Sequence, residues 1–166
     1  KIPTTLPIRI LKIPSGTFSF TDPKYLSIFT NFFLKKTKCI DPIPNAINAI
    51  LNKTEFTLYG DDYGTPDGTC VRDYIHVIDL IEAHILAVSK LKNDGGGFFY
   101  NVGAGHGHSN KEVLDVIQNI SGSEINTKIV NRRLGDADIL IADPTLIKGD
   151  LGFIPKHSDL KTIVKS

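Results

Sequence analysis

The stretch YGDDYGTPDGTCVRDYIHVIDL, residues 59–80, decides the fold because it joins a short strand, a turn-rich loop and the start of a helix. The segment DDYGTPDGT consists of turn-forming residues, which places it in a surface loop. Arg72 follows in an extended segment beside apolar Val71 and Ile75, so its side chain is expected to face what the loop encloses. An ion pair of Arg72 with Asp73 or Asp79 is the structural alternative.

Arginine is scarce in this chain, which has it only at positions 9, 72, 132 and 133 among 19 basic residues. A guanidinium is a planar, permanently charged group that binds phosphate or carboxylate through two hydrogen bonds. The motif Arg132-Arg133-Leu-Gly-Asp136 adds a carboxylate that can accept hydrogen bonds from vicinal hydroxyls. Together these motifs suit a sugar that carries phosphate, whereas a solvated arginine pair beside a turn aspartate is the alternative.

Length and composition bound the class of protein. The 166 residues, 41% hydrophobic and with a formal net charge of +1, suit one globular domain. The two cysteines show no metal-ligand spacing, which favours a reduced compartment. The longest apolar run, residues 25–34, is about half of what a membrane span needs. Because the chain starts at Lys1 and lacks methionine, we expect it to be a piece of a longer protein.

The hydrophobic pattern predicts alternating short strands and helices, hence an α/β fold. Strands are expected at residues 8–13, 55–59, 98–102 and 127–131, and helices at 44–52 and 80–91. Further helices are expected where Ser109, Asp143 and Ser158 act as N-caps, and Asp79 with Glu82 is read as a capping-box pair. The helix over 80–91 should place Leu80, Ile81, His84, Ile85 and Val88 on one face.

The motif GAGHG, residues 103–107, follows a strand and precedes a helix. Its glycines are spaced G-x-G-x-G instead of G-x-G-x-x-G, so a tight loop is favoured over a dinucleotide site. His106 and His108 lack a third ligand at metal-site spacing and are expected to be exposed. His76 and His84 are expected to pack or hydrogen-bond inside the fold.

Three segments in order, GDDYGTPDGTCVRDYIHVIDLIEAH, FFYNVGAGHGHS and RRLGDADILIADP, closely resemble consecutive segments of UDP-glucose 4-epimerases, which belong to the extended short-chain dehydrogenase/reductase family. The resemblance covers residues 44–153 densely. It implies the C-terminal, substrate-binding part of an α/β enzyme whose N-terminal Rossmann half is not in this sequence. Residues 1–43 are then a divergent, irregular segment, and residues 44–166 a UDP-sugar-binding domain.

The resemblance also implies residue roles. Arg72 and Arg133 would hold the diphosphate of a UDP-hexose, Asp136 would bind ribose hydroxyls, and Tyr59 would lie beside the uracil. The complete enzyme would use NAD for UDP-glucose/UDP-galactose interconversion in galactose metabolism. It would be cytoplasmic and homodimeric, with no nucleic-acid or membrane partner.

The departures from the family limit these expectations. No Tyr-x-x-x-Lys pair and no Rossmann glycine motif is present, so no catalytic, NAD-binding or metal-binding residue is assigned. Residues 10–12 replace a family segment that contacts nicotinamide and sugar. We therefore expect this chain alone to be inactive. A non-catalytic relic or interaction module, and another nucleotide-sugar enzyme of the same family, are the alternatives. A basic nucleic-acid-binding arm in residues 1–60 is a weaker one.

Overall fold

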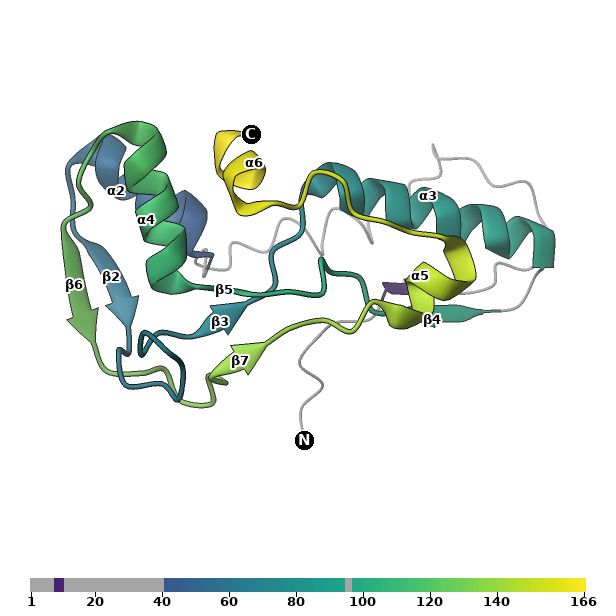
Figure 1. Cartoon of the computed structure of the whole chain (residues 1–166), viewed down its shortest axis with the longest axis horizontal. Coiled ribbons are helices and arrows are strands. Elements are labelled where there is room, and N and C mark those ends of the chain that lie inside the picture. Colours follow the sequence, from purple (N-terminus) through teal and green to yellow (C-terminus); the bar gives the residue numbers. More distant parts are fainter. Residues whose placement is uncertain (1–7, 11–40, 95–96) are drawn as a thin grey trace, which may run out of the picture.

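The computed structural model describes residues 8–10, 41–94 and 97–166, and the predictions for residues 11–40 lie outside these ranges (Figure 1). The helices are α2 (Pro42–Asn52), α3 (Val77–Asp94), α4 (Asn110–Ser121), α5 (Thr145–Leu151) and α6 (Leu160–Lys165). The strands are β1 (Ile8–Ile10), β2 (Phe56–Tyr59), β3 (Val71–Arg72), β4 (Phe98–Tyr100), β5 (His108–Ser109), β6 (Thr127–Val130) and β7 (Ile139–Leu140). The predicted α/β organisation is confirmed.

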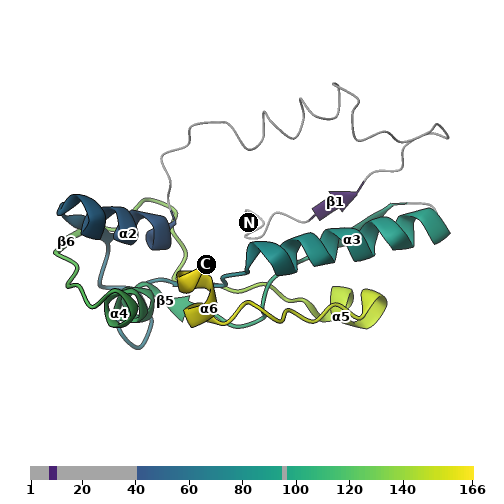
Figure 2. The same cartoon turned by 90° about the horizontal axis from the view of Figure 1, so that it is seen from above.

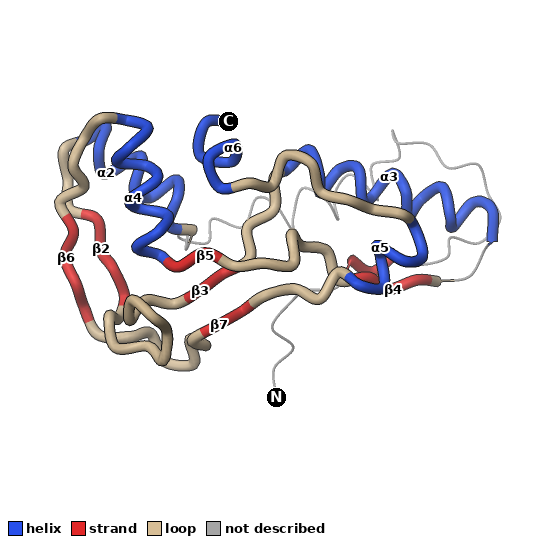
Figure 3. The backbone as a smooth tube through the Cα atoms, in the orientation of Figure 1, coloured by secondary structure: helices blue, strands red, loops and turns tan. Residues whose placement is uncertain are grey.

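The described strands form small sheets instead of one continuous sheet (Figure 3). β2 and β6 pair in parallel, with Phe56 opposite Thr127 and Tyr59 opposite Val130. β3 lies between antiparallel β5 and parallel β7. β1 pairs antiparallel with β4. The sheet of β3, β5 and β7 lies between two helical groups at opposite ends of the molecule.

The first helical group, α2, α4 and α6, packs with β2 around a hydrophobic core. Its buried residues are Ile43, Ala46, Ala49, Phe56, Leu58, Val113, Leu114, Ile117, Ile125 and Leu160. α2 begins two residues before the predicted start because Asp41 caps it, its carboxylate accepting a hydrogen bond from the Ile43 amide at 3.0 Å. The prolines at positions 42 and 44 are tolerated in the first turn, where amides have no helical partner.

The second helical group contains α3 and α5, which pack around Ala83, Ala87, Tyr100, Ile147 and Phe153. α3 starts at Val77, three residues before the predicted start. The predicted capping role of Asp79 is wrong. Instead, His76 caps α3, since its Nδ1 accepts from the Ile78 amide at 3.1 Å. This also confirms that His76 hydrogen-bonds inside the fold, as does His84, whose Nδ1 lies 2.7 Å from the Leu80 carbonyl.

Asp79 is fully buried and ties the C-terminal segment to α3. Its carboxylate accepts hydrogen bonds from the amides of Lys156 and His157 at 3.1 and 2.9 Å and from the Ser158 hydroxyl at 2.5 Å. The predicted N-cap role of Ser158 is therefore also wrong. The cap of α6 is Asp159, which accepts from the Thr162 amide at 3.0 Å.

The cap of α4 is as predicted. The Ser109 hydroxyl accepts from the Glu112 amide, and the Glu112 carboxylate accepts from the Ser109 amide, which completes a capping box. Gly122 ends the helix at a φ of 67°. At α5, by contrast, Pro144 and not Asp143 occupies the cap position, and the Asp143 carboxylate accepts from Thr145.

The predicted apolar face of α3 exists, but part of it is exposed. Ile81, Ile85 and Val88 keep between 42% and 61% of their surface accessible, whereas Ala83 and Ala87 are buried on the opposite side. Figure 2 shows α5 and α6 along one side of α3. None of the helices in the described ranges combines the length and apolar character that crossing a membrane requires.

Candidate functional site

The loop between β2 and β3 is shaped by two glycines and one carboxylate. Gly60 and Gly68 have φ values of 81° and 78°, and a Cβ atom at Gly68 would lie 2.1 Å from the Asp61 carbonyl oxygen. The Asp67 carboxylate accepts from the amide and hydroxyl of Thr69, each at 2.8 Å, and from the Ser109 hydroxyl. Burial raises the pKa of Asp67, but these hydrogen bonds outweigh burial and leave it below its ordinary value. The loop is therefore fixed to the start of α4.

A cleft of about 1050 Å³ opens between α2, the end of β2, β3 and the segment after β6. All four residues that the sequence singled out for substrate binding line it, namely Tyr59, Arg72, Arg133 and Asp136. They come from three separate parts of the chain. The fold thus brings together the two arginine motifs that the sequence places about 60 residues apart.

Arg72 and Asp136 form an ion pair at one side of the cleft. The Arg72 Nη2 atom lies 2.6 Å from Asp136 Oδ1, and the two side chains are 21% and 27% exposed. The Nη1 atom of Arg72 donates to the Val71 carbonyl oxygen at 2.7 Å. Asp73 and Asp79, the partners named in the structural alternative, do not pair with Arg72, because their carboxylates accept hydrogen bonds from backbone amides elsewhere. The arginine is held in place and partly accessible, as an anion-binding group must be.

Arg133 and Tyr59 form the second element of the cleft. The Arg133 guanidinium lies over the Tyr59 ring with 3.7 Å between its central carbon and the ring centroid. Tyr59 ends β2 and pairs with Val130, which stands three residues before Arg133. Stacking on the ring orients the guanidinium plane without using its hydrogen-bond donors. Those donors can therefore serve a ligand.

Arg132 points to a different set of partners. Its Nε donates to Asp62 Oδ1 at 2.7 Å, and its Nη1 lies 3.3 Å from Asp138 Oδ1. Its guanidinium also lies over the Tyr63 ring, 4.4 Å from the centroid. Arg132 does not line the cleft. The two adjacent arginines therefore have different roles. Arg133 lines the cleft, and Arg132 links the loop after β2 to the segment after β6.

Sequence reasoning missed the contribution of α2 to the cleft. Asn45, Asn48 and Asn52 all line it, and their spacing of three and four residues places them on one helical face. That spacing is visible in the sequence and was the available signal. Tyr74 also lines the cleft, and its buried hydroxyl finds no hydrogen-bond partner among the described residues.

The GAGHG loop does not fit a dinucleotide pyrophosphate, which needs free amides and close backbone approach. The Asp73 carboxylate already accepts hydrogen bonds from the amides of Ala104 and Gly105, at 2.9 and 3.0 Å. A Cβ atom at Gly103 would lie 2.4 Å from Asp73 Oδ2. Packing against Asp73 therefore explains Gly103, whereas Gly105 has a φ of 82° and Gly107 packs against Val71 and Ile141.

The loop histidines form no metal site. His106 is exposed as predicted, whereas His108 is partly buried, with its Nδ1 3.6 Å from Glu112 and its ring 5.4 Å from that of His106. Within the described ranges, no group of three or more His, Cys, Asp or Glu residues is placed to hold a metal ion.

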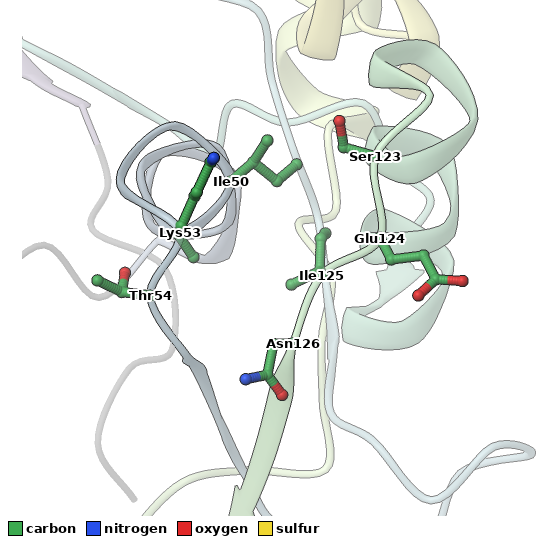
Figure 4. A pocket seen from close by; sticks show the side chains of 8 residues that line it. Ile50, Lys53, Thr54, Ser123, Glu124, Ile125 and Asn126 are labelled. Carbon is green, nitrogen blue, oxygen red and sulfur yellow. The ribbon is translucent and has the colours of Figure 1, made fainter.

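A second cavity, of about 350 Å³, lies where α2 ends and the segment before β6 begins (Figure 4). Lys53, Ser123, Glu124 and Asn126 border it together with apolar Ile50 and Ile125. These side chains include neither a nucleophile–base pair nor an arginine. We assign it no chemistry.

Comparison with known proteins shows which family this chain resembles. Residues 36–103 match the NAD dependent epimerase/dehydratase family. UDP-glucose 4-epimerase of Azospirillum brasilense is 43% identical over 122 residues, and that of Mycoplasma pneumoniae 47% over 119 residues. These alignments cover 73% and 70% of this chain, which spans only 35% of the length of each relative.

Solved structures agree. UDP-glucose 4-epimerase from Brucella ovis, in complex with NAD, matches with a TM-score of 0.69 and 44% identity, over 76% of this chain and 39% of that one. The enzyme from Bifidobacterium longum, in complex with NAD+ and UDP, matches with a TM-score of 0.71 and 28% identity, over 96% of this chain and 58% of that one. The chain therefore resembles, in sequence and in structure, a part of the UDP-glucose 4-epimerases.

Proposed function

We propose that residues 44–166 bind the UDP moiety of a UDP-hexose, as the substrate-binding part of an NAD-dependent UDP-glucose 4-epimerase. The observation that carries this proposal is the convergence of Arg72, Arg133 and Asp136 on one cleft, from segments about 60 residues apart. Two guanidinium groups supply the charge that a diphosphate requires. Asp136 supplies an acceptor for ribose hydroxyls.

Tyr59 completes the site at the end of β2. The Arg133 guanidinium covers the face of its ring, and we infer that the main chain at the end of the strand faces the base. Polar side chains of α2, among them that of Asn48, line the same cleft as β2. This arrangement suits a uracil, which presents both hydrogen-bond donors and acceptors at its edge.

We further propose that this chain binds the nucleotide and does not by itself catalyse the epimerisation. The described residues offer no pyrophosphate cradle at the GAGHG loop, and the sequence has no Tyr-x-x-x-Lys pair to move a proton at the sugar hydroxyl. Interconversion of UDP-glucose and UDP-galactose by the purified chain with added NAD would overturn this part.

Isothermal titration calorimetry with UDP tests the binding site. The unmodified chain should bind UDP at one site, and Arg72→Ala should weaken binding at least about 10-fold, as expected for loss of a charge-assisted hydrogen bond. Lys161→Ala is the matched control, because Lys161 is an exposed cation on α6 that does not line the cleft. Absence of heat from the unmodified chain, or equal affinities of the Arg72 and Lys161 variants, would refute the proposal.

A non-catalytic interaction module is the second candidate. The exposed residues Ile81, Ile85 and Val88 on α3 favour it, since they form an apolar stripe on a long helix. Calorimetry separates the two candidates, because only the first requires that the chain bind UDP and lose that binding with Arg72.

A further inference from the structure

Tyr63 stands behind the Arg72–Asp136 pair and contacts the carboxylate from the other side. Its side chain is almost fully buried, with 4% of its surface accessible. Its hydroxyl donates to Asp136 Oδ2 at 3.2 Å, while the other oxygen, Oδ1, accepts from Arg72 at 2.6 Å. Each oxygen of Asp136 therefore has one protein donor, and those donors come from different segments.

The Tyr63 ring is fixed by its neighbours. A Cβ atom at Gly60 would lie 2.6 Å from the Tyr63 ring and 2.7 Å from Arg132 Cγ, so the three residues are packed in contact. The Arg132 guanidinium covers the ring and is itself anchored by Asp62 at 2.7 Å. The main chain holds the residue as well, because the Tyr63 amide donates to the Gly68 carbonyl oxygen at 2.9 Å. The phenol is thus a rigid donor.

Tyr63 also keeps its proton. Burial, followed by the negative charge of Asp136, raises the pKa of Tyr63 to about 12. At neutral pH the phenol can therefore only donate toward the carboxylate. It has no role as an acid or base there, and it does not line the cleft.

We propose that Tyr63 is a positioning residue for the nucleotide site: it fixes the Asp136 carboxylate so that its remaining lone pairs face the hydroxyls of a bound ribose. An ionised carboxylate can accept about four hydrogen bonds, and the protein uses one on each oxygen. Without the phenol, one oxygen loses its tether and the carboxylate can turn about its own side-chain bonds. This inference rests on the proposed function, which supplies the ribose.

The test compares UDP with its 2′,3′-dideoxy analogue on the unmodified chain and on Tyr63→Phe. The variant keeps the ring and its packing and removes only the hydroxyl. We expect UDP affinity to fall about 5-fold to 10-fold, as for one hydrogen bond to a charged group, while affinity for the dideoxy analogue changes less than about 2-fold. Equal loss with both ligands would show a merely structural role, and no loss with UDP would also overturn the inference.

A second measurement does not require a ligand. In a chain labelled with 13Cζ-tyrosine, the Tyr63 resonance should titrate near pH 12, and Asp136→Asn should lower that midpoint because it removes the neighbouring negative charge. Asp115→Asn, which changes an exposed carboxylate on α4, should leave it unchanged. If the titration midpoint of Tyr63 is the same in Asp136→Asn as in the unmodified chain, the hydrogen bond between Tyr63 and Asp136 is refuted. Failure of the unmodified chain to bind UDP, with the tether present, would instead overturn the proposed function and with it the role toward ribose.

Discussion

Replacing Asp79 by alanine should remove the carboxylate that ties residues 156–158 to α3. The side chain has no accessible surface, and it accepts hydrogen bonds from two amides and one hydroxyl. A hydrogen bond to a charged group contributes about 1.5–3 kcal/mol, and a buried donor left without a partner costs about 1–3 kcal/mol. Because the three bonds share one acceptor, their contributions do not add fully. We expect the free energy of unfolding to fall by about 3–5 kcal/mol.

Urea unfolding followed by far-UV circular dichroism measures this loss, since the chain contains no tryptophan. Glu82→Ala is the matched control on the same helix. Glu82 pairs with Lys156 at 3.5 Å, but the Lys156 side chain is 64% exposed, and pairs of this kind contribute about 0–1 kcal/mol. If Asp79→Ala costs no more than Glu82→Ala at the same m value, the reasoning about the buried carboxylate is wrong.

The pH dependence gives an independent check on Asp79. Burial raises the pKa of this carboxyl, but the hydrogen bonds from Ser158, Lys156 and His157 outweigh burial and hold it below 3.8. Because the folded-state pKa is depressed, the stabilisation is fully present above the unfolded-state pKa and is lost as the pH falls through the folded value. The stability difference between the unmodified chain and Asp79→Ala should therefore shrink below about pH 4.

Two further pairs of substitutions can be tested with the same unfolding assay. Gly103→Ala should destabilise the chain by about 1–3 kcal/mol, because the new Cβ atom would lie 2.4 Å from Asp73 Oδ2. Gly149 lies in α5, and a Cβ atom there would have no neighbouring atom within 4 Å. Gly149→Ala should therefore stabilise the chain by up to about 1 kcal/mol. Ser109→Ala should cost about 1–2 kcal/mol through loss of the α4 cap and of the hydrogen bond to Asp67, against less than about 0.5 kcal/mol for Ser121→Ala at the exposed end of the same helix. Equal effects within either pair would contradict the structural explanation.

Elements specified by neighbouring residues could be predicted from the sequence. The capping box of α4 needs only a serine and a glutamate three residues apart, and the left-handed end of the same helix needs only Gly122. Both signals act within one helical turn, so no distant segment can change them. The same locality explains why strand β2 was predicted to within one residue.

Asp79 and Ser158 show where local reasoning fails. Both are good capping residues next to a helix, yet they bond to each other across 79 positions of sequence. That contact exists only because the segment after α5 returns along α3. His76 caps α3 instead, because its ring nitrogen Nδ1 accepts a hydrogen bond from the Ile78 amide.

The apolar stripe of α3 marks a second limit. Helical periodicity correctly predicts that Ile81, Ile85 and Val88 share a face, but it does not predict whether anything covers that face. In the described structure the opposite side, with Ala83 and Ala87, is the buried one. The buried face of α3 is therefore the one that carries small alanines at helical spacing, and large apolar side chains alone did not identify it.

The positions of Arg72, Arg133 and Asp136 in the cleft are set by strand pairing more than by the ion pair between Arg72 and Asp136. Tyr59 pairs with Val130 at the end of β2 and β6, and Arg72 pairs with Leu140 on β3 and β7. The segment 131–138 is thereby fixed at both ends beside the loop between β2 and β3, which it contacts through Asp138 and Arg132, and this brings Asp136 to Arg72. The ion pair forms at 2.6 Å because backbone pairing has already brought its partners close. Two pairs of short strands therefore position the charges, and this explains why Arg72 found its partner 64 residues away instead of at the adjacent Asp73.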